Sequence, residues 1–196
     1  MQQINSKSVG DPAKFHSLQT LEQRLAALPD APASTGRVAL IIRRTAGGLR
    51  EYPARAMMTL AEGLPGDAWG RQADRTVESQ LAVIQWDVAE LIANGQPLGL
   101  SGDNLILELD LSAANLPPGS RLRVGYAVMK VTPMPHNGCR KFKARFGPDA
   151  LHFVSKPDLR HRNLRGIYLR VEEPGEVAVG DRVEVLERTH RVDPSV

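Results

Sequence analysis

Cysteine is almost absent from this chain, because only Cys139 occurs among 196 residues. A single thiol cannot close an internal disulfide, and it cannot form a zinc site built on two or four cysteines. If Cys139 is chemically active, it therefore acts alone.

Long apolar runs and aromatic residues are also scarce. No run of eighteen or more apolar residues occurs, so no segment predicts a transmembrane helix. The first fifteen residues have neither the apolar stretch of a secretory signal nor the composition of a transit peptide, and we expect a cytoplasmic protein. Aromatic residues form 5% of the chain, which offers few rings for base stacking and disfavours nucleic acid as a partner.

The basic charge is concentrated in one part of the chain. The formal net charge is +3, yet residues 139–170 contain nine Lys or Arg against two Asp, which gives +7 there and −4 elsewhere. The segment LRHRNLRG, with Arg160, Arg162 and Arg165, suits a phosphate-bearing ligand. This distribution indicates an anionic ligand or an acidic partner.

The N-terminal part predicts one amphipathic helix over 11–28. Asp11 is the expected N-cap, Pro12 takes the first helical position, and leucines follow at spacings of three and four until Pro29. Residues 1–10 are polar and unpatterned, and we expect them to be disordered. Residues 30–35 have the composition of a linker.

From residue 37 onward, short β-rich segments alternate with Gly and Pro turns, which favours a barrel or sandwich over a βαβ sheet. The predicted strands are 37–44, 80–85, 104–110, 121–125, 127–132, 166–173, 176–180 and 182–188. One inserted helix is predicted over 86–95. The expected fold is one mainly β domain with a few short helices and the N-terminal amphipathic helix.

The segment PMPHNGCRKFKARFG (133–147) places Cys139 between a turn that contains His136 and a basic run. The spacing of the two phenylalanines and the glycine that follows them predict a short helix, with Cys139 at or just before its first turn. Free backbone N–H groups and the neighbouring Arg140 and Lys141 favour the thiolate, a nucleophile or soft metal ligand. A lone cysteine is also commonly a small buried apolar residue, and the residues alone leave both interpretations open.

Two further segments contain candidate binding residues. AEGLPGDAWG (61–70) lacks the spacing of a phosphate loop, and is either a surface loop or an anion-binding concavity closed by Arg71. Asn104 either satisfies a turn or presents its amide to a ligand. No H-E-x-x-H, G-x-S-x-G or Ser/His/Asp order is present to predict a hydrolase.

In series, the segments of this chain resemble a known family, the MOSC domain, named for the C-terminal domain of molybdenum cofactor sulfurases. The resemblance rests on GLPGD (63–67), ESQLAVIQWDVAEL (78–91), SGDNLILELDLSAANLPPGSRLRVG (101–125), AVMKVT (127–132), HNGCRKF (136–142) and LRGIYLRVEEPGEVAVGDRVEVL (164–186). The chain is similar to a stand-alone bacterial-type member. The resemblance implies an N-terminal tail and helix (1–34), a MOSC domain (35–188) with a barrel like the β-barrel domain of pyruvate kinase, and a C-terminal tail (189–196).

The resemblance also implies a function for Cys139. MOSC domains carry sulfur on such a cysteine as a persulfide, received from a pyridoxal-phosphate cysteine desulfurase, or hold the molybdenum of a pterin cofactor through it. In related proteins, including the mitochondrial amidoxime reducing component, the cofactor reduces N-hydroxylated compounds. The implied partner is a desulfurase or an electron-donating reductase. Pyridoxal phosphate belongs to that partner, since no lysine here has a recognisable Schiff-base setting.

Cys139 matches the family cysteine, Asp67 the aspartate of the Gly-Asp loop, and Asn104 an asparagine that follows Gly-Glu in many relatives. Cys139 is thus the candidate catalytic residue and molybdenum ligand, and the candidate cofactor-binding residues are Asp67, Arg71, Asn104, His136, Arg140, Lys141 and Arg162.

The chain departs from the family pattern at three points. DAWGRQ lacks a histidine that many relatives have after Gly-Asp, Gly138 stands where many have proline, and Asp103 stands where glutamate is common. The alternative function is a non-catalytic anion-binding or protein-interaction module that uses the basic patch 140–170 and leaves Cys139 inert.

Overall fold

A closed barrel of seven strands forms the larger part of the computed structural model, which describes residues 4–5 and 7–189. The barrel strands are β1 (Thr35–Ile41), β5 (Leu81–Gln85), β6 (Leu105–Leu107), β7 (Arg121–Val124), β8 (Ala127–Val131), β9 (Ile167–Glu173) and β11 (Arg182–Glu187). Their order around the barrel is β1, β11, β7, β8, β9, β5, β6, and every neighbouring pair is antiparallel except β5 with β6. Two small antiparallel pairs flank it: β2 (Arg43–Arg44) with β3 (Arg50–Glu51), and β4 (Arg55–Met58) with β10 (Gly175–Ala178).

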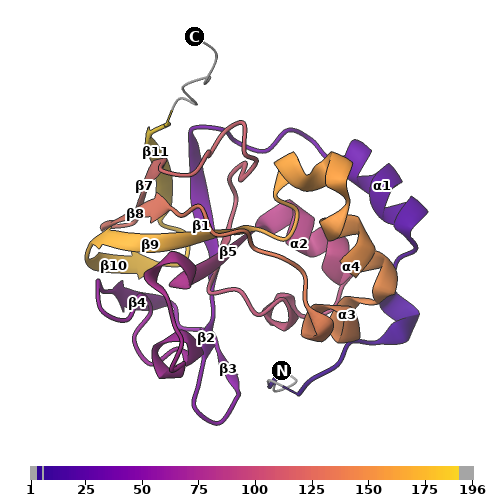
Figure 1. Cartoon of the computed structure of the whole chain (residues 1–196), viewed down its shortest axis with the longest axis horizontal. Coiled ribbons are helices and arrows are strands. Elements are labelled where there is room, and N and C mark those ends of the chain that lie inside the picture. The colour runs from indigo at the N-terminus through magenta and orange to yellow at the C-terminus, as the bar shows by residue number, and fades with distance from the viewer. Residues whose placement is uncertain (1–3, 6, 190–196) are drawn as a thin grey trace.

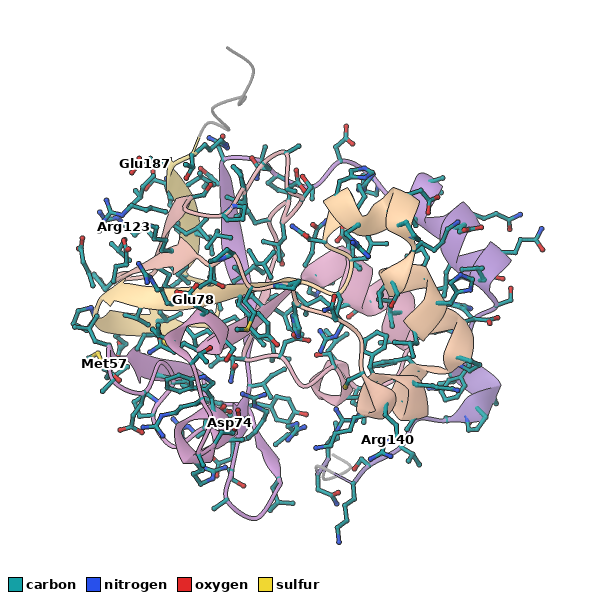
Figure 2. All side chains as sticks on the ribbon, in the orientation of Figure 1. Met57, Asp74, Glu78, Arg123, Arg140 and Glu187 are labelled. Atoms are coloured by element: carbon teal, nitrogen blue, oxygen red, sulfur yellow. The ribbon has the colours of Figure 1, made fainter. Side chains whose placement is uncertain are left out.

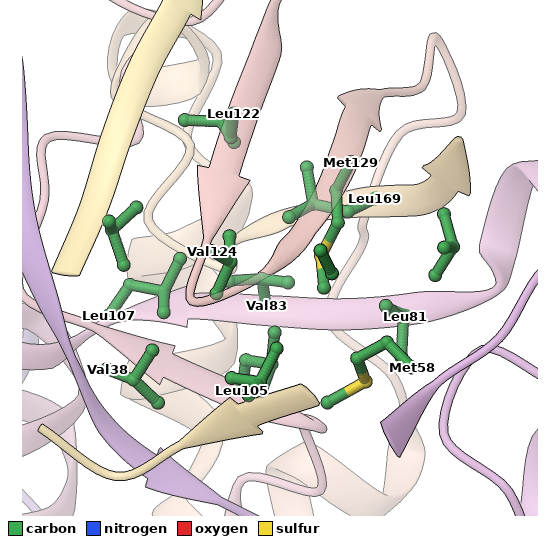
Figure 3. Packing of buried hydrophobic residues seen from close by; sticks show 14 of the residues in the cluster. Val38, Met58, Leu81, Val83, Leu105, Leu107, Leu122, Val124, Met129 and Leu169 are labelled. Carbon is green, nitrogen blue, oxygen red and sulfur yellow. The ribbon is translucent and has the colours of Figure 1, made fainter. Parts of the chain in front are cut away.

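The barrel interior is filled by aliphatic side chains from every strand (Figure 3). Burial alternates along β7 and β9, because successive side chains of a strand point to opposite faces. Val38, Leu107 and Leu122 are at most 1% exposed and belong to this interior cluster. The barrel is therefore a packed core rather than a channel.

Four helices gather on one side of the barrel (Figure 1). They are α1 (Leu18–Ala26), α2 (Trp86–Ala93), α3 (Arg140–Phe146) and α4 (Pro148–Ser155). α2 contacts β5 and β6, while α1 contacts both α2 and α4. This cover explains why all five residues of β5 are buried. None of the helices in the described ranges is long and apolar enough to cross a membrane.

The predicted barrel is confirmed, and each predicted strand segment contains a strand. The helix predicted over 86–95 is α2, which ends at Asn94 in the left-handed conformation. The structure adds β3, β4 and α4, which were not predicted. β3 and β4 are only two and four residues long, and α4 follows α3 with only Gly147 between them.

The continuous helix predicted over 11–28 is wrong. Asp11 caps a separate 3-10 helix, η1 (Pro12–Lys14), and the α-helix begins only at Leu18, where the Ser17 hydroxyl accepts a hydrogen bond from the amide of Thr20. The intervening residue 15 has an extended backbone.

The expected disorder of residues 1–10 is also contradicted for the residues that the structure describes there. Ile4 is buried, and its carbonyl accepts a hydrogen bond from the amide of Arg50 at 2.8 Å. The division into 1–34, 35–188 and 189–196 stays a prediction, and 190–196 lie outside the described residues.

Candidate functional site

The loop 100–104, just before β6, binds arginine side chains from distant parts of the chain. Arg145 donates a hydrogen bond to the carbonyl of residue 100 at 3.0 Å. Arg165 and Arg44 donate to the carbonyls of residues 101 and 102, each at 3.3 Å. Arg50 lies beside the same loop, and we call Arg44, Arg50, Arg145 and Arg165 the arginine cluster.

Two buried carboxylates contact the arginine cluster. Asp103 accepts hydrogen bonds from Arg165 Nη1 at 2.9 and 3.0 Å, and Asp67 accepts from the backbone amide and Nε of Arg44 at 2.7 and 3.0 Å. Burial alone would raise the pKa of both carboxyl groups, but the paired arginines lower it below the ordinary value. Both are therefore ionised at neutral pH, and four guanidinium groups face two carboxylates.

Among the described residues, Arg44, Arg50 and Arg165 share two carboxylates, so the positive charge of these three side chains is not fully balanced, and Arg50 shows the effect. Burial, followed by the charges of Arg145 and Arg44, lowers the pKa of Arg50 to about 10. Its Nε is buried and has no hydrogen-bond partner among the described residues. Gly102, with φ of +85°, leaves open the space between two of these side chains, because an added Cβ would lie 3.2 Å from Arg145 Nη1 and 3.8 Å from Arg50 Nη2. Unpaired donors and excess positive charge suit an anionic ligand.

His136 lies at the edge of this group. Its side chain is 6% exposed, and its ring packs on Tyr168 with a centroid separation of 4.3 Å. Burial, followed by the charge of Arg165, lowers the pKa of His136 to about 3, so the ring is neutral at pH 7. Its Nδ1 lies 3.7 Å from Asp103 Oδ1, which is too long for a hydrogen bond, and the two do not form an ion pair at neutral pH.

Cys139 is the N-cap of α3, as the sequence predicts, and its side chain is exposed. Phe142 and Phe146 are buried on one face with their centroids 4.9 Å apart, and Gly147 ends the helix. Cys139 interacts electrostatically with Arg145, which places the thiol near the arginine cluster. Since the thiol is exposed, the interpretation of Cys139 as a small buried apolar residue is wrong.

Two other predicted binding residues are buried next to the arginine cluster. Asp67 and Asn104 both bind Arg44, and the amide oxygen of Asn104 accepts from Arg44 Nη2 at 3.3 Å and from the amide of Ala82 at 3.0 Å. These contacts position Arg44. They use much of the hydrogen-bonding capacity of both side chains, which indicates that the two residues orient the arginine.

The predicted basic residues lie on the surface. Arg71 donates to the carbonyls of Gly66 and Arg44 at 2.8 and 2.7 Å and so closes the 61–70 loop. Arg140 and Lys141 are exposed on α3 beside Cys139, and Figure 2 shows Arg140 at the start of that helix. Arg162 is exposed on η5 (Pro157–Arg162), and among the described residues no hydrogen bond or ion pair connects it to the arginine cluster. Their assignment to cofactor binding stays a prediction.

Sequence reasoning missed most of the arginine cluster. Arg44, Arg50 and Arg145 were not proposed as binding residues, and Tyr168 was not considered. A usable signal existed for Arg145, because it lies between two phenylalanines on the short helix and follows one of them by three positions, which places it on the apolar face. No comparable local signal marks the other two arginines.

Comparison with known proteins supports the resemblance. A family model described as the MOSC domain matches residues 76–184. The crystal structure of the YuaD protein from Bacillus subtilis is 20% identical over 77% of this chain and 95% of that chain, with a TM-score of 0.53. That of YiiM from Escherichia coli is 20% identical over 78% of this chain and 71% of that chain, also with a TM-score of 0.53.

At this identity the likeness to solved structures concerns the fold alone. No curated protein matches the chain. The family model covers more than half of the sequence, and its match includes Cys139, loop 100–104 and strands β5 to β10 of the structure. On this basis, the chain belongs to the MOSC domain family.

Proposed function

We propose that this protein binds a molybdenum-pterin cofactor, with Cys139 as the thiolate ligand of the metal and the arginine cluster as the binding site of its anionic part. One observation carries the proposal: the exposed thiol of Cys139 interacts electrostatically with Arg145, beside Arg44, Arg50 and Arg165, three guanidinium groups that share two carboxylates among the described residues. A phosphate would balance this charge, and guanidinium groups bind phosphate with several directed hydrogen bonds.

The donor atoms fit such a cofactor. A thiolate is a soft ligand, and the described residues contain no group of three or more His, Cys, Asp or Glu that could hold a metal ion by itself. A metal at Cys139 would therefore take its other ligands from the pterin dithiolene. The buried Nε atoms of Arg50 and Arg165 have no partner among the described residues and can donate to phosphate or pterin oxygens.

The bound cofactor would supply two-electron redox chemistry, and the surrounding residues would orient it. Asp67 and Asp103 fix the directions of Arg44 and Arg165 through hydrogen bonds. The ring of His136 lies 3.7 Å from Asp103 and is neutral at pH 7, so it adds no positive charge beside the cofactor. We propose N-hydroxylated compounds as the substrate class, a reductase as the electron donor, and the cytoplasm as the location.

The exposure of Cys139 favours a second function, the carriage of sulfur. The Cys139 thiolate would attack the outer sulfur of a persulfide on a partner desulfurase, form a new S–S bond, and release the desulfurase thiolate. The pyridoxal phosphate of that reaction belongs to the partner. An exposed position at the start of a helix is open to a protein-bound persulfide.

Cys139→Ser tests both functions. The protein is produced in a host that makes molybdenum cofactor, and its molybdenum content is measured by mass spectrometry. Separate samples receive a cysteine desulfurase with cysteine and are assayed for persulfide by thiol labelling with reductive release. We expect Cys139→Ser to lose whichever signal the wild-type protein has, and Arg123→Gln, on the barrel side away from the helices (Figure 2), to keep it.

Equal molybdenum and persulfide signals in Cys139→Ser and wild type would contradict both functions. The absence of both signals in the wild-type protein, together with an alkylation rate of Cys139 no faster than that of an ordinary thiol, would favour the non-catalytic anion-binding module.

A further inference from the structure

A cavity of about 990 Å³ lies between the 113–118 loop, the segment 131–136 and η5. We call it the proline-lined cavity, because its walls include Pro117, Pro118, Pro133, Pro135 and Pro157. Leu116, Met134 and Ile167 add apolar surface. The volume of this cavity is at the upper end of the range typical of small-molecule sites. The rigid proline rings beside the flexible thioether of Met134 suit a flat apolar ligand.

The charged residues of this cavity are all of one sign. Arg160 and Arg188 line it, and none of the described lining residues is acidic. Arg188 donates hydrogen bonds to Asn115 Oδ1 at 3.1 and 3.0 Å and to the carbonyl of Ala33 at 2.9 Å. These acceptors are neutral, and no described residue forms an ion pair with Arg188.

Arg160 is exposed on η5, and its side chain forms no hydrogen bond or ion pair with any described residue. Such a side chain is available to an incoming anion. A long cationic side chain at the rim of an apolar cavity favours a ligand that combines an apolar body with an anionic group.

We propose that the proline-lined cavity binds an organic anion with an aromatic body, of the aryl sulfonate or aryl carboxylate class. The aromatic body lies against the prolines and Met134, and the anionic group lies beside Arg160 and Arg188. The cavity shares none of its lining residues with the arginine cluster. The proposal is therefore independent of whether Cys139 holds molybdenum or sulfur.

His136 connects the proline-lined cavity to the arginine cluster, because it lines the cavity and also lies 3.7 Å from Asp103, the partner of Arg165. His136 stands three positions before Cys139 in the sequence.

The test uses 8-anilinonaphthalene-1-sulfonate, an aromatic sulfonate whose fluorescence rises in an apolar site, titrated into the full chain. We expect saturable binding at one site per molecule. Ala114→Trp, at an exposed position that lines the cavity, should weaken it about tenfold or more by filling the space. Arg160→Gln should weaken it by roughly tenfold, the effect of one charge-assisted hydrogen bond.

Two controls separate this site from non-specific binding. Arg123→Gln makes the same charge change on the exposed outer face of β7 and should bind the sulfonate as the wild type does. N-Phenyl-1-naphthylamine, which lacks the sulfonate, should bind wild type and Arg160→Gln equally. Unchanged sulfonate affinity in Ala114→Trp, equal affinities of Arg160→Gln and Arg123→Gln, or the absence of saturable binding would each overturn the proposal. If Ala114→Trp fails to fold, the comparison of Arg160→Gln with Arg123→Gln still tests the proposal.

Discussion

The carboxylate of Asp103 receives two hydrogen bonds from one nitrogen of Arg165, Nη1, at 2.9 and 3.0 Å. The two side chains are 0% and 8% exposed. Both groups lose their hydration on folding, and their mutual attraction offsets that loss only while both are present. The pair also joins loop 100–104 to the start of β9, so it positions the loop that binds the arginine cluster.

Removal of one partner from this pair should be costly. Arg165→Met leaves an uncompensated carboxylate in the interior, and we expect the free energy of unfolding to fall by about 3–5 kcal/mol. The double variant Asp103→Leu with Arg165→Met should lose much less than the sum of the two single variants. Urea unfolding of the four proteins measures the coupling. A loss in Arg165→Met no larger than in the exposed Arg123→Met would contradict a buried pair.

The neutral state of His136 predicts sensitivity to acid. The folded protein holds its pKa at about 3, below the ordinary value of 6.5. Between these pH values the unfolded chain binds a proton that the folded protein does not, so stability is complete above pH 6.5 and falls as the pH is lowered. We expect wild type to lose roughly 2 kcal/mol between pH 6.5 and 4.5 through this group, as measured by urea unfolding at each pH.

His136→Phe should remove that pH dependence, because phenylalanine keeps a ring against Tyr168 and has no proton to bind. Asp67 and Asp103 do not interfere in this window, since their lowered pKa values act only below the ordinary value of 3.8. Burial also lowers the pKa of His16, so His16→Phe is the matched control and should keep most of the slope. Equal slopes in wild type and His136→Phe would show that the imidazole is not held neutral.

Much of the barrel was predictable because its strands carry their own signals. The residues of β7 and β9 alternate between buried and more exposed positions, and Gly and Pro mark the turns between strands. α4 was not predicted because it follows α3 after a single glycine, although the proline at its first position is a helix-start signal. At the break between η1 and α1, Phe15 packs against Gly147, which is 132 positions away and has no local signal, while Ser17 is a local N-cap signal for the start of α1.

The site was predictable only where its residues are neighbours in sequence. Cys139 stands next to a glycine turn and a basic helix start, and both features were visible. Arg44 reaches loop 100–104 across 58 positions, and Arg145 across 45. Arg145 has a local signal in its spacing from Phe142, but Arg44 and Arg50 have the same sequence pattern as surface arginines, because their neighbours in the site lie far away in the sequence.

We expect Arg50 to strengthen anion binding without stabilising the free protein. Because burial and neighbouring charges oppose its positive form, Arg50→Gln is expected to leave the free protein equally stable or more stable by about 0.5–2 kcal/mol. The same variant should lose most of the rise in unfolding temperature that inorganic phosphate gives to wild type, because one donor to the anion is gone. Thermal unfolding with and without phosphate measures both effects. A phosphate effect that Arg50→Gln retains in full would place the anion elsewhere.

Gly138 lies directly before Cys139 and packs against α4. A Cβ at this position would lie 2.4 Å from Leu151 Cδ1 and 3.2 Å from Val154 Cγ2, so Gly138→Ala forces these side chains to move. We expect it to destabilise the protein by about 1–3 kcal/mol, as overpacking does. Gly47→Ala is the matched control, because nothing lies within 4 Å of a Cβ there, and it should be close to neutral.

Leu151→Ala makes the space that the added methyl group needs. The double variant Gly138→Ala with Leu151→Ala should therefore be destabilised less than the sum of the single changes, by roughly 1 kcal/mol. If Gly138 sets the position of the thiol, the rate at which iodoacetamide alkylates Cys139 should also change in Gly138→Ala and return toward the wild-type rate in the double variant. Additive stabilities with an unaltered alkylation rate would show that this contact neither stores strain nor directs the sulfur.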